Sequence, residues 1–294
     1  MRPLNASGPA LLLALAIVSG VAAEPPMEKQ ILLGPESVAQ WAVAESTLEA
    51  SSVRTRSQQP VLHWHIAVDY FTGEPKYPVG WPRISCPLRE AAAQNWAGWD
   101  FLQFWVYTDT TRNALPSEPA GLALYTPDKE GAYNRPLTEL GKGQWVPIRI
   151  PLTQVPRHQE VRLIQFHISE ANYRHQDQLD FYFDELTLLR YAHPTLLDLT
   201  AEQTVMFADT QQVPVRFNLA GVKPGESVEV ACELRQAGKM LAQAKATATR
   251  GPQRLVFDLH RARLRPGEYE LVAHAAGGMD TSTARVRLVA SPWK

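Results

Sequence analysis

The sequence predicts an all-β protein built from two consecutive β-sandwich domains. In the segment 62–69, apolar residues at even positions alternate with mostly polar residues at odd positions, which is the two-residue period of a strand with one buried face. Clusters of Gly, Pro, Asn and Asp separate this segment from others like it. The aromatic content falls sharply near residue 192, which places a domain boundary there. With an N-terminal leader, the 294-residue chain is thus divided into 1–23, a first domain at 24–192 and a second domain at 193–294.

Residues 1–23 have the features of a secretory signal peptide. An early positive charge at Arg2 precedes an apolar stretch over 10–18, and the small residues Val21, Ala22 and Ala23 follow. We therefore expect the mature protein in the periplasm or outside the cell. No later segment reaches the roughly 20 apolar residues that a membrane-spanning helix needs, so we expect no membrane span.

Alternation continues through most of the first domain. Helix signals are confined to two short stretches, 38–50 and 88–93. The segments with the period of a strand are 62–68, 101–107, 145–150, 163–169 and 179–188.

The second domain begins near Ala192-His193-Pro194. All tryptophans except Trp293, and eight of the nine tyrosines, precede this point. Short strands are expected at 213–219, 227–234, 239–249, 254–259, 269–275 and 281–289. Pro-Gly and Gly-Pro turns recur between them at the spacing of an immunoglobulin-like sandwich.

The charge distribution argues against a nucleic-acid partner, and the two cysteines allow two alternatives. The formal net charge is −1 and the charged residues are scattered, so no basic stripe is available for a phosphate backbone and we expect no nucleic-acid partner. Cys86 and Cys232 fall in different expected domains. An exported protein can oxidise two such cysteines to a disulfide, and two separately buried thiols are the alternative.

Several segments carry a family resemblance. WAGWDFLQFWVY (96–107), GKGQWVPIRIPL (141–152) and LDFYFDELTLL (179–189) resemble the strands of galactose-binding-like jelly rolls, among them carbohydrate-binding modules. The resemblance spans about residues 31–190. The second domain resembles bacterial immunoglobulin-like domains, most clearly at LRPGEYEL (264–271). Together these resemblances imply a jelly-roll β-sandwich followed by an immunoglobulin-like β-sandwich.

Side-chain alternation then suggests a binding face. If the even-numbered residues of the strands at 101–107, 145–150 and 163–169 fill the core, the odd-numbered ones face outward. We expect the outward side chains to form one glycan-binding surface, because aromatic rings stack on sugar faces and planar polar groups bond hydroxyls. The expected ligand-binding residues are Trp105, Tyr107, Arg149, Gln165 and His167. In the alternative interpretation, loops or the second domain cover this face.

The sequence contains two groups of candidate metal ligands. The resemblance implies a possible structural calcium ion at Asp180 and Asp184, where carboxylates would supply hard oxygen ligands; solvated acids are the alternative. His63 and His65 share one face of a strand and could bind zinc, although the sequence indicates no third ligand. We expect no other cofactor.

No hydrolase motif identifies a catalytic residue. The chain lacks the G-x-S-x-G, H-E-x-x-H, Walker and dinucleotide-binding patterns, and the sequence does not pair the two carboxylates that a glycosidase needs. The favoured hypothesis is a secreted, non-catalytic carbohydrate-binding protein that recognises a polysaccharide or glycoconjugate. The alternatives are a structural or assembly protein that binds another secreted protein, and a glycoside hydrolase or lyase acting from the sandwich.

Overall fold

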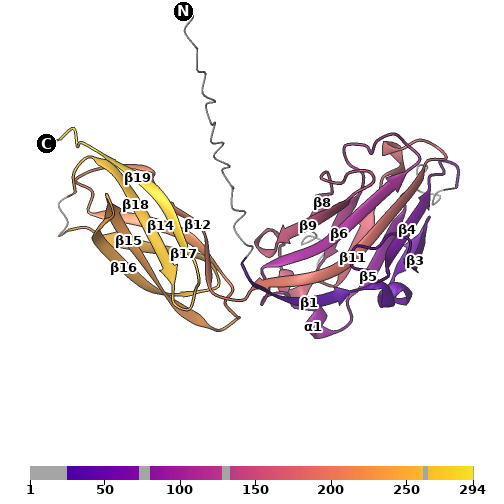
Figure 1. Cartoon of the computed structure of the whole chain (residues 1–294), viewed down its shortest axis with the longest axis horizontal. Coiled ribbons are helices and arrows are strands. Elements are labelled where there is room, and N and C mark those ends of the chain that lie inside the picture. Colours follow the sequence, from indigo (N-terminus) through magenta and orange to yellow (C-terminus); the bar gives the residue numbers. More distant parts are fainter. Residues whose placement is uncertain (1–24, 73–79, 128–132, 261–263, 294) are drawn as a thin grey trace, which may run out of the picture.

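A computed structural model describes residues 25–72, 80–127, 133–260 and 264–293, and the expected signal peptide at 1–23 lies outside them. Strands far outnumber helices in the described chain, and the helices are short, so the all-β prediction is confirmed. Figure 1 shows two β-sandwiches placed end to end, each with its own sheets. Within the described residues, no helix has the length and apolar character needed to cross a membrane.

The first domain packs two antiparallel sheets around one core, as a jelly-roll sandwich requires. Sheet A has the strand order β3-β4-β11-β6-β9. The long strand β11 pairs with β4 along its first half and with β1 along its second half. Its strands are β1 (Met27–Leu33), β3 (Thr47–Ser51), β4 (Val61–Ala67), β6 (Phe101–Thr110), β9 (Trp145–Pro151) and β11 (Gln178–Tyr191). Sheet B has the order β2-β5-β10-β7-β8. Its strands are β2 (Ala42–Ala44), β5 (Arg83–Pro87), β7 (Gly121–Tyr125), β8 (Tyr133–Pro136) and β10 (Leu163–His167).

Alternation in the sequence determines which side chains enter this core. Along β6, Leu102, Phe104 and Val106 are fully buried between the sheets, whereas the residues between them are only half-buried on the outer face. The rings of Phe104 and Phe166 meet edge to face, 5.3 Å apart, and join sheet A to sheet B. Trp64 also lies in the core.

The helical expectations are only partly correct. A 3-10 helix η1 (Pro35–Gln40) covers the start of the stretch 38–50, and the rest of that stretch forms β2 and β3 instead. Pairing of β3 with β4 provides the hydrogen bonds that an isolated helix would have made internally. The described residues also form the short helices α1 (Ala91–Gln94), η3 (Leu152–Gln154), η4 (His158–Glu160) and η5 (Glu170–Asn172).

The second domain is a smaller two-sheet sandwich. One sheet has the order β12-β14-β17 and the other the order β13-β19-β18-β15-β16. Its strands are β12 (Thr195–Ala201), β13 (Val205–Phe207), β14 (Gln212–Ala220), β15 (Ser227–Gln236), β16 (Lys239–Thr249), β17 (Gly251–Asp258), β18 (Gly267–Ala275) and β19 (Thr281–Val289). All six expected strands are present. The immunoglobulin-like assignment of this sandwich stays an interpretation of the sequence.

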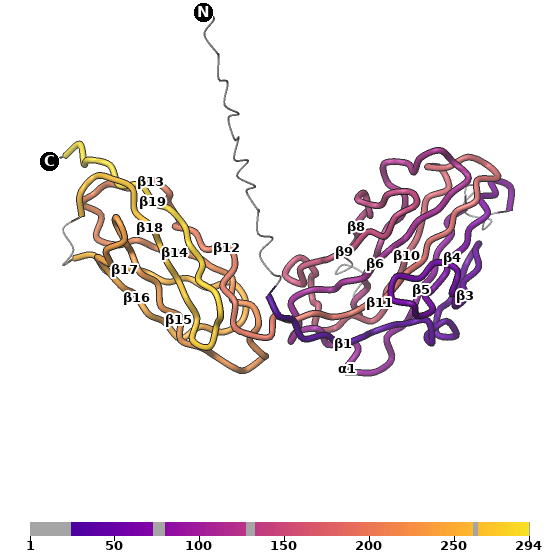
Figure 2. The backbone as a smooth tube through the Cα atoms, viewed as in Figure 1, coloured from indigo at the N-terminus to yellow at the C-terminus, as the bar shows by residue number. Residues whose placement is uncertain are grey.

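The two domains meet at a short joint. The chain leaves β11 at Tyr191 and enters β12 at Thr195 (Figure 2). Residues of both domains, including Trp99 and Phe101 from the first and Leu197 and Pro252 from the second, line a cavity of about 350 Å³. In Figure 1, β3 and β4 lie on the side of the first domain that is farthest from this joint.

The two cysteines are buried and free, each in a separate core. Burial raises the pKa of the Cys86 thiol to about 11 and that of Cys232 to about 12. Of the two alternatives for the cysteines, the structure therefore has the separately buried thiols.

Candidate functional site

A row of rings crosses the outer face of sheet A. Trp145 on β9 pairs directly with Tyr107 on β6, Tyr107 pairs with Tyr182 on β11, and Tyr182 pairs with His63 on β4. Directly paired residues of an antiparallel sheet point to the same side. We call Trp145, Tyr107, Tyr182 and His63 the ring row. With strands about 4.8 Å apart, the row spans roughly 14 Å across the sheet.

The rings of the row contact one another in sequence. Tyr107 lies 5.7 Å from Trp145 and 5.9 Å from Tyr182 between ring centroids, and both contacts are inclined. His63 stacks on Tyr182 at 4.3 Å with almost parallel planes. Tyr182, flanked on both sides, keeps 7% of its surface exposed, whereas Trp145, Tyr107 and His63 are half-buried. The row is therefore a preformed aromatic surface rather than a set of independent side chains.

Two arginines from the loop between β3 and β4 lie over this face. The guanidinium carbon of Arg54 is 5.3 Å from the ring centre of Tyr107, and that of Arg56 is 4.6 Å from Trp105, the next outward residue along β6. Nε of Arg56 also donates to Oδ2 of Asp184 at 3.2 Å. Burial raises the pKa of Asp184, and Arg56 opposes that rise. The loop thus places guanidinium donors beside the aromatic rings.

A polar pair lies farther along the same face. Nε of Arg149 on β9 donates to Oε1 of Gln103 on β6 at 2.7 Å, and the two residues are direct register partners. The guanidinium of Arg149 also lies 5.6 Å from the ring centre of Phe101. Arg149 is therefore held in one orientation on the outer face.

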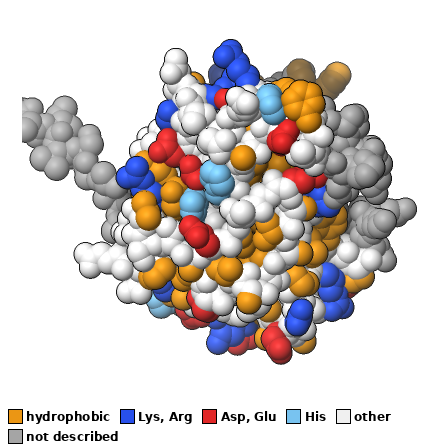
Figure 3. All heavy atoms as spheres, turned by 90° about the vertical axis from the view of Figure 1, so that its right-hand side faces the viewer, with side chains coloured by type: hydrophobic (Ala, Val, Ile, Leu, Met, Phe, Trp, Pro, Cys, Tyr) orange, Lys and Arg blue, Asp and Glu red, His pale blue; other side chains and the backbone are white. Residues whose placement is uncertain are grey.

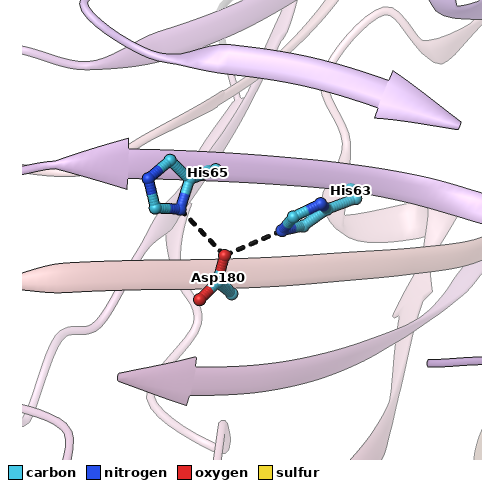
Figure 4. Close-up of side chains that lie close together, drawn as sticks. All are labelled: His63, His65 and Asp180. Atoms are coloured by element: carbon cyan, nitrogen blue, oxygen red, sulfur yellow. Dashed lines mark hydrogen bonds and ion pairs between the residues drawn. The ribbon is translucent and has the colours of Figure 1, made fainter. Parts of the chain in front are cut away.

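At the other end of the ring row, two histidines converge on one carboxylate (Figure 4). Nε2 of His63 and Nδ1 of His65, both on β4, lie 2.8 Å and 2.9 Å from the same oxygen, Oδ1 of Asp180 on β11. On its far side, Nδ1 of His63 is 3.1 Å from Oε1 of Glu49 on β3. We call His63, His65 and Asp180 the His-Asp-His cluster. Asp180 therefore adds a third side chain with a ligand atom close to the two histidines, a neighbour that alternation along β4 did not indicate.

Hydrogen bonds within this cluster favour the charged forms of Asp180 and His63. Hydrogen bonds from the two histidines hold the pKa of Asp180 below its usual range, against the opposing effect of burial. The hydrogen bond to Asp180, and more weakly that to Glu49, raises the pKa of His63. Figure 3, which views this end of the first domain, shows histidine side chains beside acidic ones at the surface.

The structure divides the five residues predicted to bind a ligand. Trp105, Tyr107 and Arg149 share the outer face of sheet A. Gln165 and His167 lie on β10, in the middle of sheet B, so the expectation of one shared surface is wrong for them. Alternation gives the side of a strand that a residue faces, but the two sheets of a sandwich have their outer faces on opposite sides of the domain.

The surroundings of Gln165 and His167 differ from those of the ring row. Gln165 is buried and accepts a hydrogen bond from Ser85 at 3.1 Å. His167 lines a cavity of about 370 Å³ together with Arg135, Asn134 and Glu118. Burial lowers the pKa of His167, and its Nδ1 has no hydrogen-bond partner among the described residues. A role for either residue in binding stays a prediction.

The two aspartates expected to hold calcium belong to separate groups. Asp180 lies in the His-Asp-His cluster, and Asp184 bonds Arg56 and Ser57. Four residues along one strand place their Cα atoms about 13 Å apart. Calcium binding stays a prediction, and one ion shared by both carboxylates would require a rearrangement of β11.

Sequence reasoning missed Tyr182, Trp145 and the connection of His63 to the ring row. The signal for the two aromatics was present, since Tyr182 lies between the buried Phe181 and Phe183, and Trp145 precedes the inward Val146. Their neighbours across the sheet depend on strand order and register, which alternation within one strand does not contain.

Comparisons with known proteins assign no family. No protein-family model matches the chain, and no curated protein matches its sequence. Among solved structures, a CBM27 module from Caldicellulosiruptor saccharolyticus in complex with mannohexaose is 12% identical, with a TM-score of 0.31, over 55% of this chain and 96% of that one.

Two glycoside hydrolases are similar at the same low level. The Endo-D glycoside hydrolase domain from Streptococcus pneumoniae R6 is 9% identical with a TM-score of 0.30, over 84% of this chain and 37% of that one. A β-glucuronidase from Ruminococcus gnavus is 12% identical with a TM-score of 0.26, over 89% and 45%. The chain thus spans less than half the length of either enzyme. At these identities and TM-scores, the similarities assign neither a ligand nor an activity to this chain.

Proposed function

We propose that the first domain binds a polysaccharide or glycoconjugate on the outer face of sheet A, without breaking a bond in it. The observation that carries the proposal is the ring row, in which three aromatic rings and an imidazole follow one another across four strands. Sugar rings have apolar C–H faces, and aromatic side chains on a protein surface bury such faces at low entropic cost.

Polar groups beside the row provide the second requirement of sugar recognition. Arg54 and Arg56 place guanidinium groups over Tyr107 and Trp105. Arg149 places a third beside Gln103 on the same face. Hydroxyl groups both donate and accept hydrogen bonds, so guanidinium, amide and carboxylate groups next to an aromatic surface suit them. Arg149 is already oriented by Gln103, which lowers the entropy lost when it engages a ligand.

The remaining parts of the proposal come from the sequence. The signal-peptide features of residues 1–23 support a periplasmic or extracellular location. A non-catalytic role agrees with the absence of recognisable hydrolase motifs in the sequence. The second domain would serve as a spacer or docking module.

Affinity electrophoresis tests the proposal directly. The mature chain is run in native gels containing β-glucans, xylans, mannans or pectins, one polymer in each gel. We expect at least one polymer to retard the wild type, and Tyr107→Ala and Trp105→Ala to restore the mobility seen without polymer. His167→Ala, on sheet B, is the matched control and should remain retarded.

Three outcomes would contradict the proposal. Retardation lost in His167→Ala but kept in Tyr107→Ala would move binding to sheet B. Unchanged mobility in every polymer would favour the alternative of a structural or assembly protein. Reducing sugar released over time from a retarding polymer would show that the domain is an enzyme.

A further inference from the structure

We propose that the His-Asp-His cluster on the outer face of sheet A binds a divalent transition-metal ion, with zinc the best match. The ligands would be Nε2 of His63, Nδ1 of His65 and a carboxylate oxygen of Asp180. Two imidazole nitrogens and one carboxylate oxygen are the donor set of zinc, copper, nickel and iron, whereas calcium takes oxygen ligands. The proposal concerns a site beside the ring row and does not depend on glycan binding.

The positions of the donor atoms suit such an ion. One ligand atom from each residue lies within 4.8 Å of the other two. Around a tetrahedral zinc ion with bonds near 2.1 Å, ligand atoms lie roughly 3.4 Å apart. The nitrogen-to-oxygen separations in the cluster are 2.8 Å and 2.9 Å, so the carboxylate would shift by about half an ångström to admit the ion.

Strand pairing fixes the three donors relative to one another. His65 and Asp180 are direct register partners across β4 and β11, and His63 lies two residues from His65 on the same face. Figure 4 shows both imidazoles turned toward the carboxylate. A site on two central strands of a sheet is more rigid than one on loops, and metal affinity depends on that preorganisation.

Neighbouring residues orient His63 in the way that metal-bound histidines are oriented. Its Nδ1 faces Oε1 of Glu49 at 3.1 Å, which leaves Nε2 pointing at the centre of the cluster. Histidines that bind metals commonly donate their other ring N–H to a carboxylate, which fixes the tautomer. Stacking on Tyr182 at 4.3 Å also fixes the plane of the imidazole.

The charge around the cluster favours a dication. Asp109 on β6 is the direct register partner of Asp180, so two carboxylates occupy adjacent positions on the outer face. Like charges directly opposite each other destabilise a sheet. Glu49, the register partner of His63 on β3, adds a third carboxylate to this face. A bound dication would relieve the repulsion between these carboxylates.

The site would keep an open coordination position. Three protein ligands leave at least one position for water, as in zinc sites that act on or bind a further molecule. His65 and Asp180 keep 37% and 28% of their side-chain surface exposed, so this position faces solvent. The proposed metal site adjoins the ring row on that face, because His63 belongs to both.

Zinc titration of the mature chain, without an affinity tag and after treatment with EDTA, tests the proposal. Competition with a chromogenic chelator gives the stoichiometry and affinity. We expect one equivalent to bind to the wild type and none to His65→Ala or Asp180→Asn. Glu49→Gln should bind zinc about 10- to 100-fold more weakly, the usual effect of losing a carboxylate behind a histidine ligand. His274→Ala, an exposed histidine of the second domain, is the control and should bind as the wild type does.

A second readout covers the case in which a variant fails to fold. X-ray absorption spectra of the zinc-loaded wild type should show two imidazoles in the first coordination shell. Absence of zinc binding, an equivalent that persists in both cluster variants, or a first shell of oxygen atoms would each overturn the proposal. Electrophoresis in polysaccharide gels containing EDTA tests glycan binding by the ring row in the absence of metal. Failure of the metal proposal can therefore be told apart from failure of the glycan proposal.

Discussion

The carboxylate of Asp100 in the first domain pairs with the guanidinium of Arg250 in the second, with Oδ1 and Nη2 2.5 Å apart. Oδ2 of Asp100 also accepts the backbone N–H groups of Tyr191 and Gly221, at 3.0 Å and 3.1 Å. Arg250 donates further to the carbonyl of Trp99. Asp100 is 8% exposed, and burial raises its pKa against the opposing effect of Arg250. A buried ion pair with satisfied hydrogen bonds therefore lies at the joint between the domains.

Replacing Asp100 by Ala should loosen this joint. The change leaves Arg250 without its carboxylate, and removal of one partner of a buried pair commonly costs about 3–5 kcal/mol. Differential scanning calorimetry should show a lower melting temperature, and small-angle scattering a broader distribution of molecular dimensions. Glu202→Ala, which breaks solvent-exposed pairs with Arg216 and Arg254, should change neither measurement much. Equal effects of the two variants would argue against a special role for Asp100.

Replacing Gly121 by Ala should create a clash with His167. Gly121 on β7 is the direct register partner of His167, and an added Cβ would lie 2.6 Å from the Nε2 atom of that ring. Overpacking of this kind costs about 1–3 kcal/mol. Urea unfolding of both single variants and of the Gly121→Ala, His167→Ala double variant should reveal coupling, since the second change makes room for the first. Gly98→Ala, whose added Cβ would have no atom closer than 3.5 Å, should be tolerated. Additive effects at Gly121 and His167 would contradict the clash.

His167 and His158, which burial holds neutral, should each make a destabilising contribution on mild acidification. Burial lowers the pKa of both imidazoles below the ordinary value of 6.5. Below that value the unfolded chain takes up protons that the folded chain does not, so the free energy of unfolding decreases as pH falls toward the folded-state pKa. Each histidine lowers the free energy of unfolding by at most about 1.4 kcal/mol for each pH unit of acidification. Urea unfolding between pH 7 and pH 5 should show a shallower decrease for His167→Gln and for His158→Gln. Slopes identical to that of the wild type in both variants would refute the assignment.

The two thiols should be unreactive in the folded protein. Cys86 and Cys232 are buried, and their raised pKa values of about 11 and about 12 keep them protonated at pH 8. Intact-mass analysis after alkylation should show no label in native buffer and two labels in denaturant. A Thr247→Cys variant, with its thiol on the exposed side of β16, should gain one label in native buffer and so report that the reagent is active. A wild-type chain that resists labelling even when denatured and unreduced would indicate a disulfide.

Alternation predicted most strands because hydrophobic burial on one face leaves a direct mark on the sequence. β6 begins where expected and runs three residues beyond the expected end at Tyr107, to Thr110. β3 was mistaken for part of a helix, since the Ala-rich stretch before it has helical propensity and its pairing with β4 is a tertiary effect. β1 was missed because Met27–Leu33 shows no regular alternation of buried and exposed residues.

The candidate site could be predicted only in part for a similar reason. Alternation correctly placed Trp105 and Tyr107 outward, and Arg149 with them. It could not separate the outer face of sheet A from that of sheet B, which carries Gln165 and His167. Nor could it show that Asp180 lies against His65, because the pairing joins residues more than a hundred positions apart in the chain.

The ring row takes each of its four members from a different strand, and β6 and β11 supply the two inner ones. A shift of any of these strands by one residue would turn its member into the core. The surface therefore exists only in chains whose sheet has assembled in correct register. Any ligand binding by this face would accordingly report on correct folding, because a chain with one of these strands out of register would lack the surface.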